Sequence, residues 1–213
     1  MHRVALLDDH PAVLAGLRRL IDAELDLDVV AAGLAVEDLA RQLDRTTADV
    51  LITDYDLGPD DGLAYCLRIK RRADAPAVIV YSADSGPALT LAARAAGADA
   101  IVDKAEPVSR LLTAIRAVVA GRRMLPAVPP QAFEAAVSKL DDEDLAVFAM
   151  LLDGESAPAI AQALREQESD INRRAQRIVG RLRPGRGTAL SHVAVSSGGA
   201  RATRHGVEWS SGR

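Results

Sequence analysis

The sequence predicts an α/β fold, a doubly wound five-stranded parallel sheet, followed by a small all-α unit. Two observations lead to this prediction. Up to about residue 121, short runs that are apolar at nearly every position alternate with longer segments whose apolar residues recur every three or four positions. Beyond residue 140 only the helical spacing continues. Nearly continuous apolar runs are typical of strands that are buried on both faces of a parallel sheet.

Each apolar run is followed by an amphipathic segment, so we expect five strand–helix pairs in strict order. In the last of these segments Leu111, Ile115 and Val118 share one face, and Gly121 follows as a helix stop. The expected strands are 4–7, 27–33, 49–53, 77–81 and 100–103, and the expected helices are 11–24, 35–45, 62–72, 87–96 and 107–120.

The chain is expected to divide after residue 121. Residues 122–139 contain Pro126, Pro129 and Pro130, which indicates a linker, with a short helix at 131–138. The helical unit is expected over 140–195, and its fourth helix, at about 187–195, is short and weakly amphipathic. From residue 196 the sequence is rich in Ser, Gly and Arg, which predicts a disordered tail over 196–213.

Composition narrows the class of protein. Residues 1–121 hold 13 Lys and Arg against 19 Asp and Glu, whereas residues 122–213 hold 13 against 11. Such asymmetry hints at an acidic regulatory half and a half that meets a polyanion. The single cysteine, Cys66, excludes a disulfide framework and is interpreted as a buried reduced thiol. The sequence contains neither a run of roughly 18 uncharged apolar residues nor a signal-peptide pattern, so we expect a cytoplasmic protein without a membrane partner.

Polar residues follow four of the five expected strands. Asp8 and Asp9 follow the first strand, Asp54 the third, Ser82 the fourth and Lys104 the fifth. Because ligands of open α/β sheets bind at the carboxyl ends of the strands, we expect these side chains to form one site. Single Asp or Ser residues after strands are often turn or helix-capping residues, but a complementary set at four strand ends favours a functional site.

The chemistry of this site follows from its charges. Clustered carboxylates repel one another unless a cation lies among them, and Mg²⁺ binds one or two carboxylates together with waters and phosphoryl oxygens. Asp54 is then placed as a nucleophile that forms an acyl phosphate, while Lys104 and the Ser82 hydroxyl hold the phosphoryl oxygens. The backbone carbonyl of Asp56 is a further candidate metal ligand.

The first 121 residues resemble the receiver domain of bacterial two-component response regulators. The resemblance rests on the segments LLDDHPAV, LITDYDLGPDDGL, VIVYSAD, AAGADAIVDK and LLTAIRAVVAG, which occur in this order. It implies that a histidine kinase phosphorylates Asp54 and that Asp8 and Asp9 belong to the Mg²⁺ site. It also implies that Ser82 is the switch hydroxyl and that Lys104 binds the phosphoryl group.

Two positions depart from the family pattern. The aromatic residue that the family often carries three positions before the lysine is Ile101 here, and Tyr81 is a candidate substitute. The proline usually found four positions after the phosphoacceptor is Gly58, and Pro59 follows it. The first departure bears on the route of the signal, and the second on the stiffness of the loop.

Helix signals recur after residue 140. The acidic segment after Leu140 suits a helix start, and Leu145, Phe148, Leu151 and Leu152 form its apolar stripe. Gly154 ends this helix, Ser156 caps a second helix, and Ser169 or Asp170 begins a third. The third helix places on one face Ile171, Ala175, Ile178 and Leu182, and on the other Arg173, Gln176, Arg177 and Arg181.

This helical segment resembles the helix-turn-helix output domain of the NarL/FixJ (LuxR-like) class. The matching positions are Leu140, Val147, Leu151, Gly154, Ser156, Ile160, Ala161, Leu164, Ile171, Ile178 and Leu182. The resemblance implies DNA binding by the third helix, and the candidate contacts are Asn172, Arg173, Gln176, Arg177 and Arg181. The typical Ser, Thr, Val, Lys and His of that helix are replaced here by Gln167, Asp170, Ile171, Asn172 and Arg174.

Three hypotheses remain. The leading one is a transcriptional regulator whose output unit, on phosphorylation of Asp54, is freed or pairs with a second copy as a homodimer. The second keeps the phosphorylation switch but makes the output unit a protein-interaction module without DNA binding. The third is a phosphatase, because DYDLG superficially resembles the Asp-x-Asp motif of haloacid-dehalogenase-like enzymes. Its acidic pair would lie upstream rather than downstream, so we do not expect an enzyme.

Overall fold

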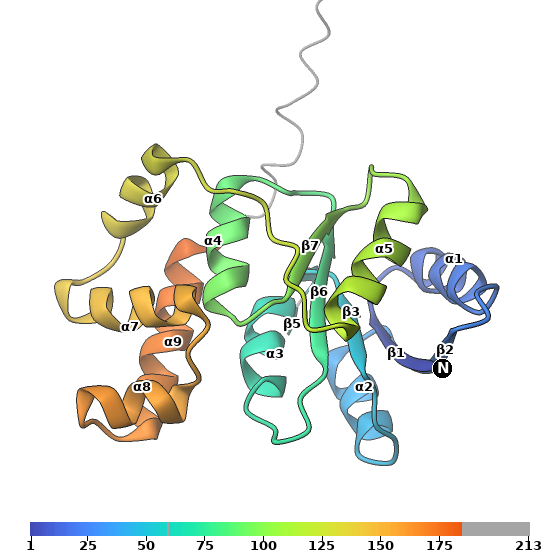
Figure 1. The fold of residues 1–213 in the computed structure, drawn as a ribbon, viewed down its shortest axis with the longest axis horizontal. Helices are drawn as coiled ribbons and strands as arrows, with labels where there is room; N and C mark the ends of the chain where they lie inside the picture. The colour runs from blue at the N-terminus through green and yellow to red at the C-terminus, as the bar shows by residue number, and fades with distance from the viewer. Residues whose placement is uncertain (59, 185–213) are drawn as a thin grey trace, which may run out of the picture.

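A computed structural model describes residues 1–58 and 60–184 of the chain (Figure 1). A parallel sheet lies at its centre, with the strand order β2-β1-β3-β6-β7. This arrangement confirms the doubly wound fold that the sequence predicts. The strands are β1 (His2–Leu7), β2 (Leu27–Gly33), β3 (Val50–Thr53), β6 (Ala77–Ser82) and β7 (Ala100–Asp103).

Helices cover both faces of this sheet. The apolar residues of α1 and α5 pack on one face, and those of α2, α3 and α4 pack on the other. Each helix ends one to three residues before the predicted end, because the last predicted residues form turns. The five helices are α1 (Pro11–Ile21), α2 (Val36–Leu43), α3 (Gly62–Ile69), α4 (Pro87–Ala95) and α5 (Val108–Val119).

A small hairpin that the sequence did not predict follows β3. Its strands, β4 (Asp56–Leu57) and β5 (Asp60–Asp61), pair antiparallel, with Asp56 opposite Asp61. Gly58 takes a φ of +63° between them, in the left-handed region that glycine adopts without strain. The hairpin therefore joins the end of a central strand directly to the start of α3.

Helices follow α5 for the rest of the described chain. They are α6 (Pro130–Val137), α7 (Asp142–Asp153), α8 (Ala157–Leu164) and α9 (Glu168–Leu182). The predicted short helix at 131–138 is confirmed as α6. Gly154, at φ +88°, ends α7, and Ser156 Oγ accepts a hydrogen bond from Ala159 N at the start of α8, as predicted. The start of α9 was predicted wrongly, since Gln167 precedes its first turn and both Ser169 and Asp170 lie within the helix.

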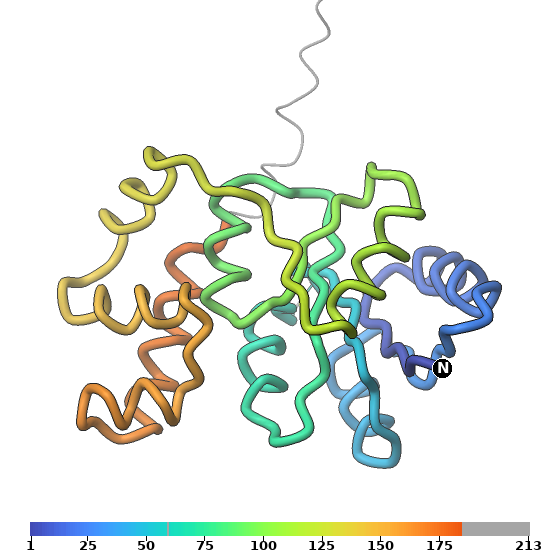
Figure 2. Tube along the Cα trace, viewed as in Figure 1, coloured from blue at the N-terminus to red at the C-terminus, as the bar shows by residue number. Residues whose placement is uncertain are grey.

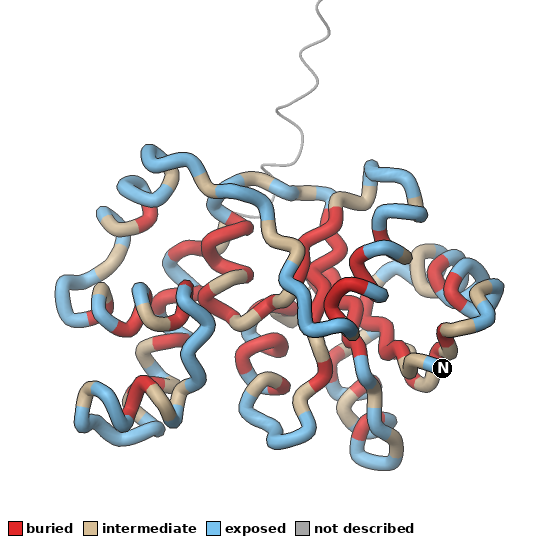
Figure 3. Tube along the Cα trace, viewed as in Figure 1, coloured by how far each residue is buried: buried red, intermediate tan, exposed pale blue. Residues whose placement is uncertain are grey.

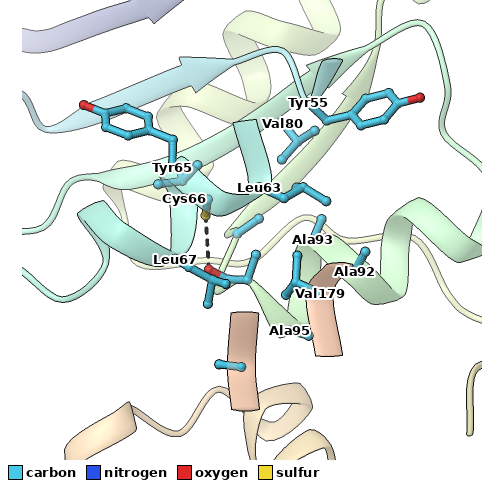
Figure 4. Packing of buried hydrophobic residues seen from close by; sticks show 14 of the residues in the cluster. Tyr55, Leu63, Tyr65, Cys66, Leu67, Val80, Ala92, Ala93, Ala95 and Val179 are labelled. Atoms are coloured by element: carbon cyan, nitrogen blue, oxygen red, sulfur yellow. Dashed lines mark hydrogen bonds between the residues drawn. The ribbon is translucent and has the colours of Figure 1, made fainter. Parts of the chain in front are cut away.

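The α/β unit (β1 to α5) and the helical unit (α6 to α9) share one apolar cluster. Helix α9 packs against α4 and α3, and Val179 of α9 lies beside Ala92 and Ala95 of α4 (Figure 4). The Cα trace shows α9 passing between α7 and α3, and buried segments continue from the sheet into α4 (Figures 2 and 3). The sequence predicted two separate units, whereas in the structure the helical unit packs against the α/β unit.

The expected linker is partly ordered against the sheet. Met124 N donates to Asp99 O (2.8 Å), and Ile101 N donates to Met124 O (3.1 Å), so the chain after α5 forms a bridge beside β7. The predicted boundaries at residues 121 and 140 stay predictions. The predicted fourth helix at 187–195 and the tail at 196–213 lie outside the described residues. Within residues 1–58 and 60–184, no helix combines the length and the apolar character needed to cross a membrane.

Candidate functional site

The register of the sheet brings the predicted polar residues to one edge. Leu7 of β1 pairs with Thr53 of β3, so Asp8 and Asp54 follow neighbouring strand ends. Ser82 pairs with Asp103 in the same way, which places Lys104 directly beyond β7. The register therefore brings these four strand ends to the same edge of the sheet.

Lys104 lies between the two most buried carboxylates of this edge. Its Nζ donates to Asp8 Oδ2 and to Asp54 Oδ2, each at 2.6 Å. The Asp8 and Asp54 side chains are only 3% and 10% exposed, so water screens this triad weakly. Lys104 therefore supplies part of the positive charge that the clustered carboxylates require. From the sequence, Lys104 was expected only to bind the phosphoryl group.

One lysine does not balance two buried carboxylates. Burial raises the pKa of Asp54 above its ordinary value, although Lys104 opposes the rise with a hydrogen bond and its charge. Burial alone would lower the pKa of Lys104, but its hydrogen bonds to Asp54 and Asp8 raise it instead. The two directions differ in cause, since burial disfavours the charged form of Asp54 whereas its two carboxylate partners favour the charged form of Lys104. Two carboxylates facing one ammonium leave a net negative charge that a further cation would neutralise.

The third carboxylate of this edge offers an oxygen to such a cation. Asp9 Oδ1 is buried and accepts no hydrogen bond, although His10 Nδ1 lies 2.7 Å away. Asp8 Oδ1 accepts from the His10 backbone N–H at 2.9 Å, and ligand atoms of Asp8, Asp9 and His10 lie within 4.8 Å of one another. Oxygen ligands of this kind suit a hard divalent cation such as Mg²⁺. The donor set therefore fits the expected metal.

The remaining predicted site residues surround Asp54. The Asp56 N–H donates to Asp54 Oδ1 at 3.3 Å, so the backbone of Asp56 lies beside the acceptor carboxylate. Ser82 is fully buried, and its Oγ accepts from Asp84 N at 2.9 Å. The ring of Tyr81 lies 5.8 Å from Lys104 Nζ, which puts an aromatic residue beside the site, while Ile101 is buried without polar contact to it.

Sequence reasoning missed two contributors to this site. A Cβ on Gly62 would lie 1.9 Å from the Asp54 carbonyl oxygen, so only glycine lets α3 begin this close to the acceptor. Its place after two aspartates, in PDDG, was the signal that could have found it. His10 was not assigned to the site, yet its backbone and ring both hydrogen-bond to Asp8 Oδ1.

The arginines of α9 are largely occupied within the helical unit. Arg177 Nε donates to Asp144 Oδ2 at 2.8 Å, and Arg174 Nε donates to Asp144 Oδ1 at 3.2 Å. Arg181 Nη1 lies 2.8 Å from Asp141 Oδ1. These pairs place acidic partners from the start of α7 beside three of the arginines, so the charge of this face is partly neutralised. They also explain why Asp144 is fully buried while Leu145, expected to face inward, is only half-buried.

The other predicted DNA contacts of α9 fall into two groups. Asn172 lines a cleft between the two units, opposite Lys70 and Arg71 at the end of α3. Arg173 and Gln176 are exposed, and Arg173 pairs with Asp170 one turn earlier. Arg177 and Arg181 are exposed as well, so of the five predicted contacts only Asn172 is partly covered.

Cys66 is buried, as expected. Its Sγ donates to Ala96 O at 3.2 Å (Figure 4). Burial raises the pKa of this thiol to about 12, so it stays protonated at neutral pH.

Comparisons with known proteins agree with this geometry. The family model described as response regulator receiver domain matches residues 4–116. Response regulator UvrY of Escherichia coli is 24% identical over an alignment of 208 residues that covers 93% of this chain and 95% of that protein. A two-component response regulator of the LuxR family from an Aurantimonas species has a solved structure that is 32% identical, with a TM-score of 0.56, and covers 66% of this chain and 99% of its own.

A second solved structure includes DNA. It is RcsB of Salmonella enterica serovar Typhimurium, bound to a promoter in the presence of the phosphomimetic BeF3⁻. It is 25% identical, has a TM-score of 0.57, and covers 89% of this chain and 95% of its own. The similarity therefore extends beyond the α/β unit into the helical unit.

Proposed function

Because the chain belongs to the response regulator receiver family, we propose that it is a two-component transcriptional regulator that is switched by phosphorylation of Asp54. The observation that carries the proposal is the triad in which Lys104 Nζ contacts Asp8 and Asp54 at 2.6 Å. A shielded carboxylate beside a lysine, with neighbouring carboxylates that can hold a cation, suits the formation of an acyl phosphate.

In the proposed reaction, an oxygen of the Asp54 carboxylate attacks the phosphorus of a phosphohistidine on a histidine kinase. A P–O bond forms, the P–N bond breaks, and the histidine leaves with its electron pair. Lys104 donates to one phosphoryl oxygen, and the Ser82 hydroxyl turns from Asp84 N to donate to another. Asp8, Asp9, Asp54 and the Asp56 carbonyl are the proposed Mg²⁺ ligands, and the metal would neutralise the charge that gathers on the phosphoryl oxygens.

For the output, we propose that α9 binds DNA after the two units separate. The promoter complex of the similar RcsB supports this assignment. In the docked arrangement α4 and α3 cover one side of α9, so phosphorylation is expected to favour an undocked state. A second copy of the chain is a proposed partner of that state.

The phosphoacceptor is tested by labelling. With a phosphorylated histidine kinase or acetyl phosphate as donor, the Asp54→Asn variant should take up no acid-labile phosphoryl group, and EDTA should abolish labelling of the wild type. Asp28→Asn, at the opposite edge of the sheet in β2, is the matched control and should be labelled normally. Labelling of Asp54→Asn at the wild-type level would refute the assignment.

The output is tested by selecting binding sites from random DNA, with and without the phosphoryl donor, at two salt concentrations. Binding that strengthens on phosphorylation and weakens with salt supports a DNA-binding output, since phosphate contacts release counterions. If no sequence is enriched at either salt concentration, the helical unit is a protein-interaction module instead.

A further inference from the structure

The end of α9 forms an ion pair with the loop that follows the phosphoacceptor. Arg183, the residue after α9, places its Nη1 2.5 Å from Asp61 Oδ2, although 122 residues separate the two in sequence. Both side chains are partly shielded, with exposed fractions of 33% and 24%. This contact ties the helical unit to the α/β unit at a point next to the candidate site.

Asp61 is held in place by its other oxygen. Asp61 Oδ1 accepts hydrogen bonds from Leu63 N (2.9 Å) and Ala64 N (3.2 Å), so the side chain caps the start of α3. The carboxylate that Arg183 meets therefore has a fixed orientation. Any movement of the start of α3 or of β5 moves this carboxylate with it.

Asp61 is also linked to Asp54 through the hairpin. Asp61 of β5 lies opposite Asp56 of β4, and the Asp56 N–H donates to Asp54 Oδ1. Gly62, the next residue, donates its N–H to Tyr55 O at 3.0 Å. The path from the acceptor carboxylate to Arg183 thus consists of one hydrogen bond, one cross-strand pair and one ion pair.

The rest of the contact between α9 and the α/β unit is mostly apolar. Ala175 and Val179 of α9 are buried, and Val179 lies beside the alanines of α4 (Figure 4). Contacts between small apolar residues do not depend on the charge at Asp54. The ion pair does depend on events at Asp54, because the Asp61 carboxylate belongs to the hairpin that carries Asp56.

We propose that the Arg183–Asp61 ion pair is the latch through which the phosphorylation state of Asp54 controls the docking of α9. This inference rests on the proposed function, since it requires Asp54 to be the phosphoacceptor. When Asp54 becomes an acyl phosphate, the negative charge shifts from its carboxylate oxygens to the phosphoryl oxygens, which Lys104 and Ser82 would hold, and the hydrogen bond from Asp56 N to Asp54 Oδ1 is weakened. The hairpin then shifts, Asp61 moves away from Arg183, and α9 is released.

The latch is tested on the full-length chain by amide hydrogen exchange of α9 and α4, with and without acetyl phosphate and Mg²⁺. Intact mass measured on the same samples gives the fraction phosphorylated. Arg183→Gln removes the positive charge of the ion pair. Asp61→Asn removes its negative charge and keeps an Oδ1 atom that caps the start of α3. Arg181→Gln is the matched control, because its ion pair with Asp141 lies within the helical unit.

Without the donor, Arg183→Gln and Asp61→Asn should each speed exchange in α9 and α4 by about fivefold, as expected for loss of one partly shielded ion pair. The double variant should exchange no faster than either single variant, and Arg183→Lys should restore slow exchange in part. Arg181→Gln should exchange in α4 as the wild type does. On phosphorylation the wild type should approach the rate of Arg183→Gln, and Arg183→Gln should change little.

Two results would overturn the latch: Arg183→Gln exchanging like the wild type without donor, or Arg183→Gln responding to phosphorylation as strongly as the wild type. A wild-type chain that gains no phosphoryl mass would instead overturn the proposed function. The comparison made without donor still shows in that case whether the ion pair holds α9, so the two failures are distinct.

Discussion

Replacing Lys104 with methionine should reveal how strongly the candidate site depends on the Lys104 ammonium group. Methionine keeps the length of the side chain but removes the charge that lies 2.6 Å from both Asp8 Oδ2 and Asp54 Oδ2. The Oδ2 atoms of the two carboxylates then face each other without the ammonium group between them. Their burial means that neither the solvent nor salt relieves the repulsion well.

The size of the effect follows from this geometry. The two oxygens share one nitrogen neighbour and therefore lie within about 5 Å of each other, where two unit charges repel by roughly 3 kcal/mol at an effective dielectric of about 20. The variant can avoid this repulsion by taking up one proton, which costs at most about 4 kcal/mol at pH 7 for a carboxyl group of ordinary acidity. We expect the free energy of unfolding at pH 7 to fall by about 3–4 kcal/mol, close to the loss for breaking a buried ion pair.

The sign of the pH dependence is fixed by the same reasoning. In the variant the folded state holds its proton more tightly than the unfolded state does, so its stability falls as pH rises. The deficit relative to the wild type should therefore be large at pH 7 and nearly vanish at about pH 4. Millimolar Mg²⁺ should restore part of it at neutral pH, because a bound cation replaces the missing charge.

Urea unfolding followed by circular dichroism, at several pH values with and without Mg²⁺, measures this deficit. Lys70→Met is the matched control, because Lys70 meets one carboxylate, Asp99, also at 2.6 Å but in a more exposed setting. It should lose only about 1 kcal/mol and should not respond to Mg²⁺. If Lys104→Met is no less stable than Lys70→Met at pH 7, or if its deficit does not depend on pH, the electrostatic account of the site is wrong.

Three further substitutions or reactions test other parts of the structure. Gly62→Ala should lower the free energy of unfolding in urea by more than ~3 kcal/mol, because its Cβ would strike the Asp54 carbonyl oxygen. Gly16→Ala, which has open space around it in α1, should stabilise the protein by ~0.5–1 kcal/mol, and equal effects of the two substitutions would contradict the close approach at Gly62. Asp144→Asn should cost about 2 kcal/mol at pH 7. Hydrogen bonds from Arg177 lower the pKa of Asp144, so its contribution is lost as pH falls and the cost should fade below about pH 4; a pH-independent cost would count against the ion pairs. Cys66 should resist a thiol reagent in the native protein at pH 8 and react only on unfolding in urea; rapid native labelling would contradict its burial.

The sheet and its polar edge were predictable from sequence because both depend on local patterns. Nearly continuous apolar runs mark the strands, and the residue after each run necessarily lies at the carboxyl edge. Asp8, Asp54, Ser82 and Lys104 were found in this way. The pairing of β4 with β5 was not, since strands of two residues leave no periodic signal.

The sequence did not predict the burial of Asp144 or its ion pairs with the arginines of α9. Acidic residues at a helix start ordinarily remain in water, where they favour the helix dipole, so Asp144 gave no sign of burial. Its partners, Arg174 and Arg177, lie 30 and 33 residues later. Only the packing of α7 against α9 brings them together. A count of arginines on a helix face therefore overstates the charge that is free to meet DNA.

Some residues that contact α9 belong to the helical unit and others to the α/β unit. Phosphorylation can release α9 only from the contacts with the α/β unit. Asp141 directly precedes α7 and Asp144 lies in its first turn. Because α7 packs against α9, we expect both residues to stay with α9 when the two units separate. Asp61 and the alanines of α4 belong to the α/β unit and would be left behind. Undocking therefore uncovers Asn172, at the cleft between the units, but leaves Arg177 and Arg181 paired. The number of phosphates neutralised on DNA binding, and with it the salt dependence, should be smaller than the arginine content of α9 suggests.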